Sequence, residues 1–392
     1  MSALTRETYE QLSSFDLVLL PIEARMRALD SFFSLPSKRE KPGRFWRVDF
    51  ELILPDPNAI EPAVAEVPVE NRDRAVIACS LATAAREHPK LLARAFGTTG
   101  IEANKFGALA KAFAGSGVFV YVPADHACDD PIVIRYHAES GAAIFPWSVV
   151  LAERGARVTV IERLTGGEGA FICGAAEVVG AEHADVTYAV LQEAAQSARV
   201  ISTRSARPGR DGQILWSVAE LGGGLAVGDV RISIGEPGAK AQLAAIFFPR
   251  ESQHVDLVST VEHLAGEATS ETLVKSAAID RGQARFLGNI RIAPHAQGSD
   301  ARLRDDALLL SPKAHIDSVP ALEIGANDVK AYHGATVGAI DAEQIFYMES
   351  RGIEPGAAER MIALGFFEPA VEWFPSLSLR DEIRAALAAK LS

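Results

Sequence analysis

The pattern of apolar positions divides the chain into three parts, of which the first is helical in character. Residues 8–28 carry apolar side chains at spacings of three and four, as on one face of an amphipathic helix: Leu12, Phe15, Leu19, Ile22 and Met26. Pro21 interrupts this stretch. Residues 71–95 are helical in character again, with Pro89 as a dividing point. The pattern predicts an N-terminal helical domain over residues 1–115.

A long β-rich body follows from about Gly115. Short strand-like runs recur there: 115–123, 131–136, 158–161, 186–191, 214–218, 230–234, 241–247 and 255–261. In one of them Val186, Tyr188 and Val190 alternate with small or polar residues, which predicts two distinct strand faces. Regular short strands favour a sandwich, a barrel or a solenoid, and no strict repeat separates the three. The predicted β core spans residues 116–325.

The chain is expected to turn helical beyond Gly325, giving a C-terminal helical domain over residues 326–392. Asp341 is predicted to cap a helix over 342–351, which Gly352 ends. Pro355 suits the first position of a second helix, which is expected to run to Gly365. A third helix, capped by Ser376 or Ser378, carries an apolar stripe: Leu379, Ile383, Leu387 and Leu391.

Charge and composition exclude several classes of partner. The formal net charge is −12, and no basic run interleaved with aromatic residues is present, so we expect no nucleic-acid partner. The N-terminus is polar and lacks the apolar core of a signal peptide. No apolar run reaches the roughly 18 residues that span a bilayer. A cytoplasmic protein without membrane contact is predicted.

The sequence offers few groups for chemistry of its own. Cys79, Cys128 and Cys173 are too far apart for a disulfide framework or a CxxC cluster site, and we interpret them as buried apolar residues. The glycine-rich stretches 166–169 and 222–224 are not followed by Lys-Ser or Lys-Thr, so no ATP site is expected. Nucleophile-elbow and HExxH patterns are absent.

Three stretches in order carry a family resemblance. The first stretch comprises residues 254–263, Ser270, Lys275 and residues 285–292. The second comprises residues 308–324. The third is Asn327-Asp-Val-Lys-Ala-Tyr-His-Gly-Ala-Thr-Val-Gly338, which leads into 341–353. Together they resemble the SufB/SufD family of iron–sulfur cluster assembly proteins, and residues 117–123 with 130–132 resemble the family's entry into its β body.

The resemblance implies a fold and a set of partners. The fold is mainly β, a right-handed parallel β-helix core flanked by N-terminal and C-terminal helical domains. The implied role is a non-catalytic scaffold subunit of a SufBCD complex, which pairs with a SufB-like subunit through the end of the β-helix. The C-terminal helices would dock a SufC-like ATPase. An iron–sulfur cluster would be held transiently and shared with SufB.

Within the family the chain looks like SufD. The form His333-Gly-Ala-Thr-Val-Gly338 is similar to SufD, whereas SufB-like chains have an acidic residue where Gly334 stands. SufD-like chains often have a cysteine at the position of Ala331, and its absence removes a soft ligand. The resemblance makes His333 the candidate metal ligand, a contact to iron or cluster at the SufB interface, since a neutral imidazole binds iron well.

Several residue groups keep two interpretations. His254 and His263, with Glu262, are either metal ligands or polar residues bonded along the β-helix. His315 and Asp317, two apart on one strand face, either bind metal or pair with each other. Five side chains of the tail form either a docking surface for the ATPase or a local helical core: Phe346, Tyr347, Arg351, Phe366 and Phe367.

Two alternative functions stay open. The first is a β-helix enzyme acting on polysaccharides, although such enzymes are usually secreted and gather acidic or basic catalytic groups on one face. The second is a homodimeric interaction module or iron donor that functions without SufB.

Overall fold

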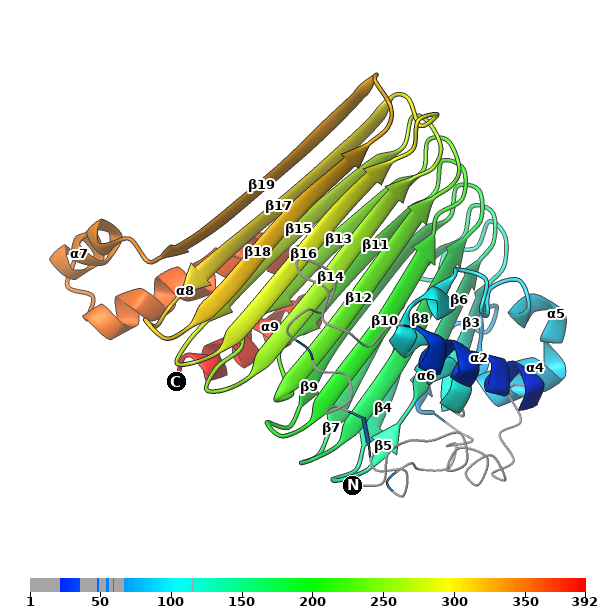
Figure 1. Ribbon diagram of the computed structural model, residues 1–392, viewed down its shortest axis with the longest axis horizontal. Helices are drawn as coiled ribbons and strands as arrows, with labels where there is room; N and C mark the ends of the chain where they lie inside the picture. The colour runs from blue at the N-terminus through cyan, green and yellow to red at the C-terminus, as the bar shows by residue number, and fades with distance from the viewer. Residues whose placement is uncertain (1–21, 36–47, 49–53, 56–58, 60–66, 115) are drawn as a thin grey trace.

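The computed structural model describes residues 22–35, 48, 54–55, 59, 67–114 and 116–392. Within these residues the protein is mainly β, with helices at both ends of a long stack of strands (Figure 1). The part of the predicted first helix before Ile22 lies outside the described residues. None of the described helices is long and apolar enough to cross a bilayer.

Successive strands of the core alternate between two sheets whose core strands run parallel. The first, called the β19 sheet, contains β4 (Ile132–Ala138), β7 (Arg157–Gly166), β9 (Asp185–Ala194), β11 (Gln213–Glu220), β13 (Lys240–Phe247), β15 (Thr269–Ala278), β17 (Ser299–Leu309) and β19 (Val329–Ala339). The short β1 (Val69–Glu70) pairs antiparallel with β4. Each pair of strands thus makes one coil of a β-solenoid.

The second sheet, called the β18 sheet, faces the first across the core. It contains β3 (Ser116–Val122), β6 (Pro146–Ala152), β8 (Phe171–Gly180), β10 (Arg199–Arg207), β12 (Leu225–Ile234), β14 (His254–His263), β16 (Gln283–Ile292) and β18 (His315–Ile324). Two short strands join it: β2 (Ile77–Ser80), antiparallel to β3, and β5 (Ala143–Ile144), beside β8. The predicted mainly β core between helical ends is confirmed, and all eight predicted runs lie within strands or overlap them.

Backbone geometry at the turns sets the repeat of the solenoid. In one row of turns, a backbone N–H of each coil donates to a backbone carbonyl of the next coil. The bonds run from Asp125 to Arg154, from Gly155 to Glu182 and from His183 to Arg210. The donors Asp125, Gly155 and His183 all have positive φ. Arg157 pairs with Asp185, 28 residues later, and Thr269 pairs with Asp300, 31 residues later. The coil length therefore varies. The turn position with positive φ is occupied by several residue types.

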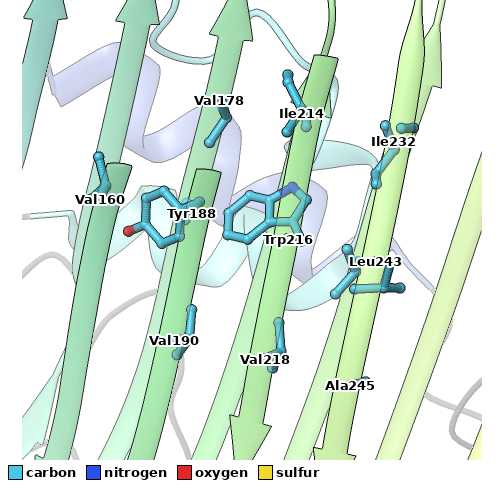
Figure 2. Close-up of a cluster of buried hydrophobic side chains, with 14 of the residues drawn as sticks. Val160, Val178, Tyr188, Val190, Ile214, Trp216, Val218, Ile232, Leu243 and Ala245 are labelled. Carbon is cyan, nitrogen blue, oxygen red and sulfur yellow. The ribbon is translucent and has the colours of Figure 1, made fainter. Parts of the chain in front are cut away.

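The core fills the space between the two sheets. Figure 2 shows Tyr188 and Trp216 side by side on β9 and β11, with valines of neighbouring strands around them. Their ring centroids lie 4.5 Å apart, and neither side chain is exposed to solvent. The predicted alternation holds, because Val186, Tyr188 and Val190 belong to this core. Burying such large apolar side chains contributes about 2–3 kcal/mol each.

The N-terminal helices cover the outer face of the β18 sheet at its β2 end (Figure 1). They are α2 (Ile22–Ser34), α4 (Leu81–Glu87), α5 (Pro89–Leu92), the 3₁₀ helix η2 (Ile101–Ala103) and α6 (Lys105–Phe113). The helical prediction for residues 71–95 is wrong at 77–80, which form β2 because they pair with β3. Cys128 and Cys173 are buried as interpreted, whereas Cys79 is half-buried.

The C-terminal helices are α7 (Ala342–Ser350), α8 (Pro355–Val371) and α9 (Leu377–Lys390). The predicted caps are confirmed: Asp341 accepts from the Glu343 N–H, and Ser376 accepts from the Leu379 N–H. Helix α8 runs past its predicted end at Gly365. α8 and α9 pack on the outer face of the β19 sheet through Leu379, Ile383 and Leu387 of α9 and further buried side chains of α8.

The expected helical start beyond Gly325 is wrong for residues 329–339. They form β19, which pairs along its length with β17. Val329 and Ala331 pack against the core, so the apolar interior continues for one more strand than the sequence indicated. The solenoid strands therefore reach Ala339, and the helices begin at Ala342. The division into three domains stays a prediction.

Candidate functional site at the open end of the solenoid

The last two strands leave one end of the solenoid uncovered, and we call this the open end. Among the described strands β18 pairs only with β16, and β19 only with β17. Each therefore has one side with unpaired backbone groups, which is a template for another strand. Exposed apolar side chains lie on both: Ile324 is 43% exposed, Tyr332 60% and Val337 45%. In Figure 1 β19 forms the edge farthest from the N-terminal helices.

His333 lies on β19 at this end. It is in register with Leu303 of β17, a core residue, so its side chain belongs to the row that faces the inside of the solenoid. The imidazole is nevertheless exposed, because β19 is the last strand of its sheet. Ala331 lies two residues earlier in the same row and offers no ligand. The role of His333 as an iron or cluster contact stays a prediction.

Gly334 makes room for a neighbouring side chain of the same strand. It lies on the outer row of β19, on the face opposite His333. A Cβ atom there would lie 2.6 Å from the hydroxyl oxygen of Tyr332. The missing side chain makes room for the Tyr332 phenol, so it does not open an approach to His333.

Asp305 of β17 is a buried carboxylate that sequence reasoning missed. Its side chain points into the core and is 0% exposed. Ser318 of β18 donates a hydrogen bond from its hydroxyl to Oδ2 of Asp305, which links the two sheets. Oδ1 has no hydrogen-bond partner among the described residues. Burial raises the pKa of Asp305 to about 7, with a further rise from the neighbouring charge of Asp306.

This raised pKa predicts a pH-dependent stability. The folded state holds the Asp305 proton more tightly than the unfolded chain does, so the contribution of this group to stability is fully present below its ordinary pKa of 3.8 and is lost as pH rises through about 7. The hydrogen bond from Ser318 and the charge of Lys275 limit the shift. We expect Asp305→Asn to be more stable than the wild type at pH 8, by roughly 2 kcal/mol, and equal to it near pH 4.

Urea unfolding at several pH values tests this. Asp328→Asn is the matched control, since Asp328 is an exposed acid of the last turn. An Asp305→Asn chain with the wild-type pH slope would show that the carboxylate does not hold a proton in the fold.

A second polar row lies on the outer face of the β19 sheet. Lys275, Asp306 and Thr336 are in register on β15, β17 and β19. Lys275 Nζ lies 2.8 Å from Asp306 Oδ2, and the Thr336 hydroxyl donates to Asp306 Oδ1 at 2.8 Å. Lys275 Nζ also lies 4.5 Å from the ring centroid of Phe366 in α8. The row joins a C-terminal helix to the edge strand.

Two of the other candidate histidines, His263 and His315, each pair with a polar side chain. His263 is buried, with Nε2 2.8 Å from the Ser270 hydroxyl, and burial lowers its pKa to about 4, which keeps it neutral. His254 is at the other end of the same strand, about 30 Å away. His315 Nε2 lies 2.8 Å from Asp317 Oδ1. Within the described residues, no three His, Cys, Asp or Glu side chains are grouped to hold a metal ion.

The predicted docking side chains of the tail divide into two groups. In α7, Phe346 is 70% exposed and Tyr347 59%, and no residue of this helix is buried. The Arg351 guanidinium lies 5.2 Å from the Tyr347 ring centroid and donates to its hydroxyl at 3.2 Å. Phe366 is half-buried, and Phe367 is fully buried against Phe248. We reassign Phe367 to the core, because it has no surface to offer a partner.

A groove of about 290 Å³ separates α7 and α8 from the ends of the nearby strands. Ile340, Ile345 and Ala363 give it an apolar floor, and Glu359 and Arg360 of α8 contribute charged groups to its lining. Helix α7 lies beyond the end of β19 (Figure 1), and its Ile345 belongs to the lining of this groove.

These features define a β-solenoid with helices on the outer face of the β18 sheet near β2 and two edge strands, β18 and β19, at its other end. Residues 134–366 match the family model described as SUF system FeS cluster assembly, SufBD core domain. Residues 64–134 match the SufBD protein N-terminal region. The chain belongs to the SufBD family of iron–sulfur cluster assembly proteins.

Similar proteins carry matching names. The chain is 28% identical over 338 residues to the iron–sulfur cluster assembly protein SufD of Bacillus subtilis. The matched region covers 84% of this chain and 77% of the B. subtilis protein. An iron–sulfur cluster assembly SufBD family protein of Staphylococcus saprophyticus is 27% identical over 311 residues, 78% of this chain and 67% of the relative. Escherichia coli SufD is 34% identical over 171 residues, 44% and 40% of the two chains.

Proposed function

We propose that this chain is a SufD-like scaffold subunit of a SufBCD complex and has no catalytic activity of its own. The observation that carries the proposal is the pair of unpaired edge strands, β18 and β19, in a chain of this family. Family membership supports this role over that of an enzyme acting on polysaccharides. The names of the B. subtilis and E. coli relatives favour SufD.

The open end is the proposed contact for a SufB-like subunit. A second solenoid end with the same two-sheet design would continue both sheets, pairing one strand with β18 and another with β19. The exposed apolar side chains Ile324 and Val337 would then become buried.

The exposed face of α7 is the proposed dock for a SufC-like ATPase. Exposed aromatic residues beside an arginine are typical anchors of protein interfaces, and Phe346, Tyr347 and Arg351 provide them. ATP would bind the ATPase and not this chain, whose glycine-rich stretches at 166–169 and 222–224 lie at or next to turns between strands. Partnership with an ATPase implies a cytoplasmic location.

ATP-driven movement would reach the open end through the Lys275–Asp306–Thr336 row. Phe366 of α8 contacts Lys275, and the row ends at Thr336 on β19. A displaced α8 would therefore alter the support of the strand that carries His333.

The iron–sulfur cluster is the cargo of the proposed complex, held transiently and shared with SufB. His333 would supply an imidazole to it. Because Ala331 offers no soft ligand, the sulfur ligands would come from the partner.

Co-purification with cognate SufB and SufC tests the function and its proposed site. We expect a stable complex whose bound iron and sulfide fall at least severalfold with His333→Ala. His137→Ala is the control, an exposed histidine of β4 far from the open end. Unchanged cluster content in an intact His333→Ala complex would make His333 structural. Failure to bind SufB or SufC would refute the proposed role.

A homodimeric module or iron donor without SufB is the second candidate. The same edge strands favour it, since the open end of one copy can pair with that of another. The molecular mass of the complex formed by the chain alone, and by the chain together with SufB, distinguishes the two. A homodimer that SufB does not displace supports the second candidate.

A further inference from the structure

We propose that Asp305 is a second iron-binding group of the open end, so that a buried carboxylate and the exposed imidazole of His333 form this chain's share of a ferrous-ion site. The inference rests on the proposed function, which it deepens by naming the form of iron that this subunit takes.

Strand register brings the two side chains to neighbouring positions. Leu303 pairs with His333 and Asp305 with Ala335, so Asp305 and His333 are diagonal neighbours on adjacent strands. Both belong to rows that face the inside of the solenoid, since Leu303 and Ala307 on either side of Asp305 are core residues. With strands about 4.8 Å apart and a rise of about 3.3 Å per residue, a two-residue offset on adjacent strands separates the Cα atoms by about 8 Å, within reach of two side chains that share one ion.

The state of the carboxylate points to a missing ligand. Asp305 is 0% exposed, yet its Oδ1 has no hydrogen-bond partner among the described residues. Such an oxygen is costly to leave unpaired in a core. The nearby cation Lys275 lies on the outer face and is paired with Asp306. A cation between Asp305 and His333 would satisfy Oδ1 from the open end.

Ser318 fixes the direction of this carboxylate. Its hydroxyl donates to Oδ2, which leaves Oδ1 for an ion. Ser318 comes from β18, Asp305 from β17 and His333 from β19, so the site exists only where the last strands of the two sheets meet. This is also where the proposed SufB contact lies.

The donor atoms indicate which form of iron would bind. One carboxylate oxygen and one imidazole nitrogen suit Fe²⁺, whereas clusters are generally held by thiolates. Ala331, in the same inward row as His333, has no sulfur. Two protein ligands leave the remaining positions to water and the partner subunit. The chain would therefore hold ferrous ion rather than an assembled cluster.

Equilibrium dialysis of Fe²⁺ against the purified full-length chain under argon tests the site. We expect Asp305→Asn and His333→Ala each to weaken binding by about tenfold or more, and Ser318→Ala by less. Asp328→Asn, which removes an exposed acid of the last turn, should bind as the wild type does. Circular dichroism of each variant verifies the fold.

Two outcomes would overturn the inference: Asp305→Asn with wild-type Fe²⁺ affinity, or a wild-type chain that binds Fe²⁺ no better than the Asp305→Asn/His333→Ala double variant. Either can occur while the chain still assembles with SufB and SufC, in which case the proposed function stands. The opposite case is also distinguishable. If the wild-type chain fails to assemble with SufB and SufC, the proposed function is refuted. If Asp305→Asn nevertheless weakens Fe²⁺ binding, the ion site stands.

Discussion

Replacing Phe346 and Tyr347 together by alanine is expected to abolish docking of the SufC-like ATPase while leaving the fold intact. Both rings are more than half exposed and α7 has no buried residue, so the free protein gains nothing from them in its core. Central aromatic anchors contribute about 2 kcal/mol or more each, so affinity should fall by a factor of several hundred. Calorimetric titration of the ATPase with each variant measures this loss.

Phe367→Ala is the control that separates docking from packing. This side chain is fully buried against Phe248, and its removal should cost about 3–5 kcal/mol of stability. Any loss of ATPase binding should then accompany partial unfolding, which the Phe346/Tyr347 variant should not show. Wild-type affinity in that double variant would mean that the ATPase docks elsewhere.

The helices of the tail and the strands of the body were predictable because their signals are local. Asp341 and Ser376 accept hydrogen bonds from N–H groups two and three residues away, respectively. The caps therefore depend only on residues that are close in sequence. Alternation in β9 likewise needs only successive side chains. The end of the solenoid was misplaced because β19 is recognisable only from its pairing with β17, 30 residues earlier.

The repeat of the solenoid was hidden for a related reason. The stacked turns require a left-handed backbone, and Asp125, Gly155, His183 and Glu267 all adopt it. Residue identity therefore varies where the backbone conformation is constant. The family resemblance supplied the architecture that periodicity alone left open.

The candidate site was only partly accessible from the sequence. His333 was found through its motif, whereas Asp305 and Ser318 carry no spacing signal, since they meet across two sheets. One local clue was present: Asp305 and Asp306 are consecutive in a strand, so they must face opposite sides of a sheet. That pattern places one charge towards the core, which is a reason to search for its partner.

The second large effect is expected at the edge strands, where Ile324→Lys with Val337→Lys should prevent pairing with a SufB-like subunit. The two side chains are 43% and 45% exposed, so the isolated chain should tolerate both changes within about 0.5 kcal/mol each. In the proposed complex the same positions would be buried. Two unpaired ammonium groups there cost several kcal/mol, and lysine is a natural blocker of strand edges.

Co-purification and light scattering give the readout. We expect the wild type to bring down SufB in a one-to-one complex and the double variant to bring down less than a tenth of that amount. Met361→Lys is the control, a 55% exposed side chain of α8 outside the open end, and it should retain SufB. If the double variant pairs as the wild type does, the contact is not at these edges. A third outcome is that SufB does not bind even the wild type, and that the wild-type chain alone forms a dimer which the double variant does not form. In that case the open end is an interface between two copies of this chain.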